Sequence, residues 1–96
     1  MSTDWDLTQT FMSAFSFKWD RIRLHERAKV GILRKLQSPL NTHRQRASLY
    51  KAKSKIESEL VLYHLNLENF CRLLTNEQLL LAVDTYVLRV PTAVRG

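Results

Sequence analysis

The feature that most constrains the fold of this sequence is a long heptad pattern in its second half. From residue 49 to residue 74, side chains recur at alternating intervals of four and three residues, and seven of these eight positions are apolar. This spacing is typical of one stripe of an α-helix in a coiled coil or a long helical hairpin. The eight positions are Leu49, Lys53, Ile56, Leu60, Tyr63, Leu67, Phe70 and Leu74.

The first half of the chain carries the same rhythm, with six of eight positions apolar. Two glycines and two prolines in 96 residues are too few for the many turns that a sheet protein needs. The sequence therefore predicts an all-α fold in a single domain spanning residues 1–96. The eight positions of this first series are Met12, Phe15, Trp19, Ile22, Glu26, Lys29, Leu33 and Leu36.

Start and stop signals divide the pattern into three helices. Thr42 with Gln45, and Thr75 with Gln78, each have the three-residue spacing of a capping box, in which two side chains satisfy each other's free backbone N–H groups. Thr3 precedes two aspartates that favour the positive end of a helix dipole. Ser38-Pro39 and Pro91 break the pattern. The predicted helices are about 4–37, about 43–73 and about 76–90.

Folding the first helix back on the second predicts a long antiparallel hairpin with its turn near residues 38–42. This register pairs Met12 with Phe70 at one end. It also places the polar residues of one stripe, Glu26 and Lys29, near the polar residue of the other, Lys53. The match of polar with polar favours a hairpin. A parallel coiled coil between the second helices of two copies is the alternative, because one apolar stripe does not determine which helix it packs against.

The third helix is about half as long as a hairpin arm and is apolar on more than one face. It can cover only the root of the hairpin, the end near Phe11, Phe15 and Phe70. The remaining apolar surface predicts a protein partner or a homodimer. The residues expected at that interface are Trp5, Phe11, Leu79, Leu80 and Tyr86.

Charge is unevenly distributed along the chain. Residues 18–55 contain twelve lysines and arginines against two acids, whereas the whole chain has a net charge of +6. The distal half of the hairpin is therefore strongly basic, and the root is mildly acidic.

A basic helical rod of this kind is typical of proteins that bind a polyanion. No Phe, Trp or Tyr lies between residues 20 and 49, which argues against stacking on bases and favours contacts with the phosphate backbone. We therefore expect an accessory or regulatory protein that binds nucleic acid, either DNA or RNA. The expected contact residues are Arg21, Arg23, Arg27, Arg34, Lys35, Arg44, Arg46 and Lys51.

Other interpretations use the same features. In a protein–protein adaptor, or a subunit of a larger assembly, the basic face would dock on an acidic partner and the apolar root would be the main contact. A basic amphipathic helix can also bind a membrane surface, and a charge run can be simply a solvated face.

Catalysis is not expected, and neither are a cofactor, a metal site or a small-molecule substrate. Gly31 stands alone and forms no glycine-rich phosphate loop, so it indicates a weak point or a close helix crossing. The histidines at 25, 43 and 64 have no partners at metal-ligand spacing. Cys71 has no visible base or oxyanion site.

The expected location is intracellular and soluble, in the cytoplasm or the nucleus. The N-terminal residues are acidic rather than basic, unlike a secretory signal. No apolar run approaches the roughly 18 residues of a membrane span, and a single cysteine excludes an internal disulfide framework.

Overall fold

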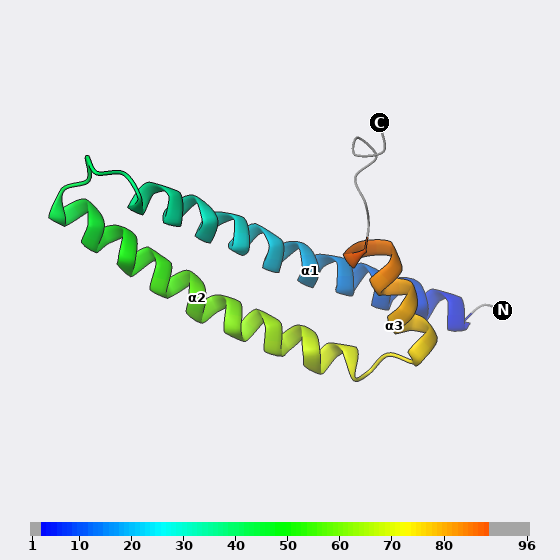
Figure 1. The fold of residues 1–96 in the computed structure, drawn as a ribbon. Helices are drawn as coiled ribbons and strands as arrows, with labels where there is room; N and C mark the ends of the chain where they lie inside the picture. Colours follow the sequence, from blue (N-terminus) through cyan, green and yellow to red (C-terminus); the bar gives the residue numbers. More distant parts are fainter. Residues whose placement is uncertain (1–2, 89–96) are drawn as a thin grey trace, which may run out of the picture. The chain divides into compact units, whose positions relative to one another are not determined.

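The structure is a computed structural model that describes residues 3–88, with side chains from residue 6 onward. It has two long helices, α1 (Thr3–Leu36) and α2 (His43–Cys71), followed by the short helix α3 (Asn76–Ala82) and a π-helical turn η1 (Val83–Val87). Figure 1 shows this order along the chain. Residues 3–88 contain no strand. The predicted all-α fold, a helical hairpin with a short third helix, is confirmed.

Both capping boxes form as predicted and fix where two helices begin. Gln45 N donates to Thr42 Oγ1 at 3.1 Å, while Thr42 N donates to Gln45 Oε1 at 2.8 Å. Thr75 and Gln78 repeat this exchange at 3.1 and 3.0 Å. Each box satisfies backbone N–H groups that the first helical turn leaves without partners.

The described residues fall into two compact units. The turn unit comprises residues 20–66, and the terminal unit comprises residues 3–19 with residues 67–88. Each unit contains part of α1 and part of α2. That the chain is a single domain stays a prediction.

The turn unit is an antiparallel helical hairpin (Figure 1). Its buried side chains are Ile22 and Leu60, which are 0 % and 8 % exposed. Polar contacts also join the two helices: Lys29 Nζ lies 3.1 Å from Glu57 Oε2, and His25 Nε2 lies 3.9 Å from Glu59 Oε1. These cross-contacts show that the helices of the turn unit run in opposite directions past each other, as the two apolar stripes predicted.

The register differs in detail from the predicted one. Lys29 and Lys53, predicted to be neighbours, share one carboxylate oxygen of Glu57, at 3.1 and 3.2 Å. Two lysines cannot face each other without a counter-charge, and Glu57 supplies it. The prediction that Glu26 also lies in the seam is wrong, because its side chain is exposed and lines a groove beside Arg23.

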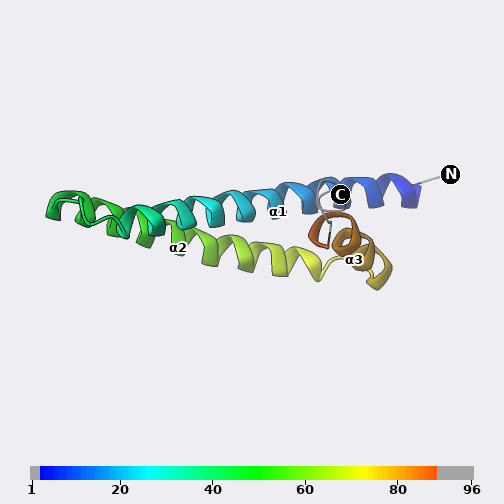
Figure 2. The same cartoon turned by 45° about the horizontal axis from the view of Figure 1, so that its top comes forward.

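In the terminal unit, α3 packs beside the N-terminal part of α1 (Figure 2). Gln78 Nε2 donates to Thr8 Oγ1 at 3.0 Å, and the rings of Phe15 and Tyr86 stack with centroids 6.0 Å apart. Phe15 and Ala82 are buried. The third helix thus covers the root, as predicted.

The C-terminal ends of the helices depart from the predicted ones. Helix α2 ends at Cys71 rather than near residue 73, because Leu73 N and Leu74 N make shorter-range bonds to Phe70 and Cys71 carbonyls. The third helix widens at Val83, where Leu88 N donates to Val83 O in a π-helical turn. The predicted end near residue 90 lies outside the described residues.

Candidate functional site

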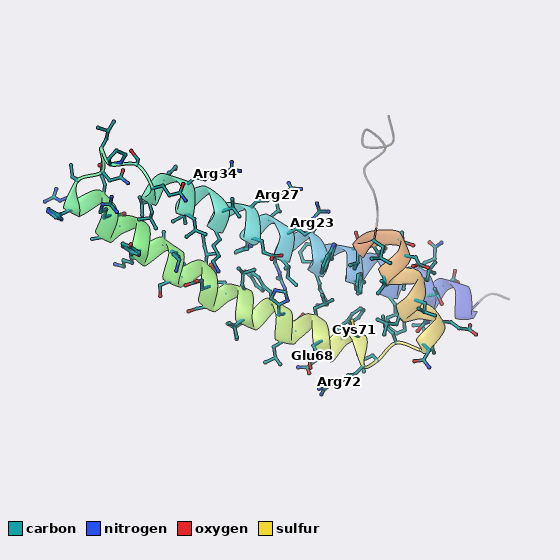
Figure 3. The ribbon with its side chains drawn as sticks, viewed as in Figure 1. Arg23, Arg27, Arg34, Glu68, Cys71 and Arg72 are labelled. Atoms are coloured by element: carbon teal, nitrogen blue, oxygen red, sulfur yellow. The ribbon has the colours of Figure 1, made fainter. Side chains whose placement is uncertain are left out.

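Three of the predicted arginines line one shallow groove on α1. Arg23, Arg27 and Arg34 border a space of about 470 Å³ together with Glu26, Val30 and Gly31. All three arginines are exposed, and Figure 3 shows them projecting from α1 on the side away from α2. We call these three residues the α1 stripe.

Helical spacing explains this alignment. At about 100° per residue, Arg23, Arg27 and Arg34 lie about 100° to 140° around α1 from the buried Ile22. Their side chains therefore point away from the hairpin seam while the backbone stays fixed by seam packing. Two acids lie near the stripe: Glu26 in the same groove, and Asp20 beside Arg23 and Arg27. They offset only part of the positive charge of the three arginines.

The remaining exposed basic residues of the predicted set lie elsewhere in the turn unit. Arg44 and Lys51 are exposed on α2. Lys35 is exposed near the turn, at a second groove of about 440 Å³ whose lining includes Asn41 and Ser48. The eight predicted residues thus do not form one continuous surface.

Arg46, predicted to contact nucleic acid, makes hydrogen bonds within the turn. Its Nη1 donates to Leu36 O at 3.3 Å and its Nη2 donates to Ser38 O at 3.4 Å. These carbonyls belong to the end of α1 and the turn after it, where backbone acceptors lack helical partners. A cation there also complements the negative end of the helix dipole.

Arg21 also makes contacts within the fold. Its guanidinium lies over the ring of Tyr63, 4.1 Å from the centroid, and the side chain is half-buried. Tyr63 also packs edge-on against His25, with centroids 4.8 Å apart. The heptad position of Tyr63 predicted that it lies between the two helices. The stacking of Arg21 on its ring depends on how α1 and α2 align, which the sequence does not determine.

Glutamates on α2 bind several of the cations at the seam. Sequence spacing indicated that Glu57 and Glu59 form surface pairs, and the Lys53–Glu57 pair on α2 is present. Glu57 additionally bridges to Lys29 on α1. Hydrogen bonds from Lys29 and Lys53 lower the pKa of Glu57 below its ordinary value. The carboxylate therefore stays charged at neutral pH, and these two lysines are less available to an external anion.

The residues predicted for a protein interface have different environments in the terminal unit. Phe11 packs edge-on against Phe70 with centroids 5.9 Å apart, and Tyr86 stacks on Phe15. Leu79 is half-buried, whereas Leu80 is 64 % exposed. The side chain of Trp5 lies outside the described residues.

The described residues offer little for other chemistry. They contain no group of three histidine, cysteine or acidic side chains placed to hold a metal ion. Burial raises the pKa of the Cys71 thiol, which keeps it protonated at neutral pH. Within residues 3–88, no helix combines the length and the apolar character needed to cross a membrane.

Comparison of the chain with family models, with curated proteins and with solved structures found no match.

Proposed function

We propose that this protein binds nucleic acid through the phosphate backbone, with the α1 stripe as the main contact. The observation that carries the proposal is the alignment of Arg23, Arg27 and Arg34 along one exposed groove. Guanidinium groups suit phosphate oxygens because they can donate two parallel hydrogen bonds and remain charged. Such a surface suits an accessory or regulatory role.

The chemistry of the stripe favours binding without base specificity. Residues 20–49 contain no Phe, Trp or Tyr on which a base could stack. Arginines on an exposed helix can reach phosphates of DNA or RNA alike, since phosphate contacts carry no sequence information directly. We therefore expect binding that depends more on salt than on sequence.

A second candidate function is that of a protein adaptor or assembly subunit. The terminal unit exposes Leu73, Leu80 and Leu81 to 69 %, 64 % and 44 %. Exposed apolar side chains of this size favour a protein contact when they are contiguous. In this alternative, the α1 stripe binds an acidic protein surface.

The test is fluorescence anisotropy with a random-sequence duplex and a single-stranded RNA, across salt from about 50 to about 200 mM. The triple variant Arg23→Ala, Arg27→Ala, Arg34→Ala should lower the log–log salt slope on duplex DNA by about three, at about 0.9 per lost phosphate contact. Circular dichroism should show unchanged helicity.

The matched control removes the same charge outside the turn unit, in Arg72→Ala, Arg89→Ala, Arg95→Ala. Its slope should stay close to that of the unmodified chain. No binding at the lowest salt, or an equal decrease in both triple variants, would contradict the proposal and favour the adaptor.

A further inference from the structure

The turn unit carries a second row of cations, on α2. Arg44, Lys51 and Lys55 are all exposed, and the intervals of seven and four residues between them align them along the helix. We call these three residues the α2 stripe. Lys55 was not among the residues predicted from the sequence, although the same interval rule finds it.

The α2 stripe points away from the hairpin seam. At about 100° per residue, its three members lie about 140° to 180° around α2 from the buried Leu60. The α1 stripe likewise lies about 100° to 140° from Ile22 on α1. Because Ile22 and Leu60 are the buried residues of this hairpin, the two stripes point outward from different helices.

The acids of the turn unit leave both stripes largely positive. Glu57 is bound to Lys29 and Lys53, and Glu59 lies beside His25. The two remaining acids, Asp20 and Glu26, lie by the α1 stripe. Residues 43–55, the segment of α2 that carries the α2 stripe, contain no acid.

We propose that one chain bridges two nucleic-acid segments, one on the α1 stripe and one on the α2 stripe. This inference rests on the proposed function, since it requires that the α1 stripe binds phosphates. Each stripe offers three charges, enough for a weak, salt-sensitive contact.

One straight duplex cannot satisfy both stripes. Two packed helices, each about 10 Å in diameter, separate the outward faces by about 20 Å of protein. A duplex with a persistence length of about 50 nm does not wrap around so small an object without a large bending cost. Two separate segments can occupy the two faces without bending.

The experiment measures capture of a fluorescent duplex on beads that carry a second, unlabelled duplex. The unmodified chain should link the two. Both the α1-stripe triple alanine variant and the variant Arg44→Ala, Lys51→Ala, Lys55→Ala should reduce capture about tenfold or more. Each variant should still bind free duplex in the anisotropy assay, and the control with Arg72, Arg89 and Arg95 replaced should capture normally.

The outcomes separate the two proposals. If the unmodified chain shows no binding in the anisotropy assay, both the proposed function and the bridging proposal are wrong. If it binds duplex normally but does not capture the second duplex, only the bridging proposal is wrong. Undiminished capture by a variant that keeps only one stripe would mean that two copies of the chain link the duplexes, which also overturns bridging by a single chain.

Discussion

Arg46 shows how one arginine in a basic segment differs from its neighbours. Arg44 and Arg46 stand two residues apart in the same stretch of sequence, and charge alone assigns both to a polyanion surface. In the structure, Arg44 is exposed, whereas Arg46 is half-buried and donates to Leu36 O and Ser38 O. Which arginine reaches back to α1 depends on the turn geometry, which composition does not encode.

Replacing Arg46 with Ala should therefore destabilise the protein. Losing two hydrogen bonds to carbonyls at the end of α1 should lower the free energy of unfolding by about 1 kcal/mol. Urea unfolding followed by circular dichroism measures this change. The matched control, Arg44→Ala, should stay within about 0.5 kcal/mol of the unmodified chain. Equal stabilities of the two variants would show that Arg46 does not hold the turn.

At the scale of the helices, the sequence predicts where α2 and α3 begin more closely than where they end. Thr42 and Thr75 fix the starts of α2 and α3 through side-chain bonds that depend only on local spacing. The end of α2 and the π-helical turn at Val83 depend on the carbonyls available to Leu74 and Leu88. The candidate site was likewise predicted only in part. The sequence locates the basic segment, but the pairing of the two helices decides that the α1 stripe is exposed while Arg21 and Arg46 contact other parts of the fold.

Gly31 gives a test of the α1 helix itself. The sequence left open whether it marks a close helix crossing, but a Cβ added there would meet no atom within 4 Å. Gly31→Ala should therefore stabilise the protein by about 0.5 to 1 kcal/mol, because Ala loses less backbone entropy than Gly in a helix. Thermal unfolding measures this gain.

The opposite exchange on the same helix, at the exposed residue Ala28, serves as the control for Gly31. Ala28→Gly should destabilise the protein by a similar amount. A loss of stability in Gly31→Ala would mean that another chain segment approaches the helix at this position.

At the scale of the whole molecule, little apolar surface is enclosed. Among the described residues, five hydrophobic side chains are buried, whereas fourteen large ones remain exposed. A chain of this size has only about 0.05 to 0.15 kcal/mol of stability per residue. The few buried positions must therefore account for most of the folding free energy.

The double variant Leu60→Asp, Leu67→Asp tests this dependence. An unpaired charge at a buried position costs about 3 kcal/mol or more, so two should exceed what the chain can tolerate. Circular dichroism at 25 °C should show most of the helical signal lost. The control Leu62→Asp, Leu65→Asp makes the same chemical change on the same helix at residues that are 63 % and 51 % exposed, and it should remain helical. If the first variant stayed folded, or if both unfolded alike, burial of Leu60 and Leu67 would not be what stabilises the helices.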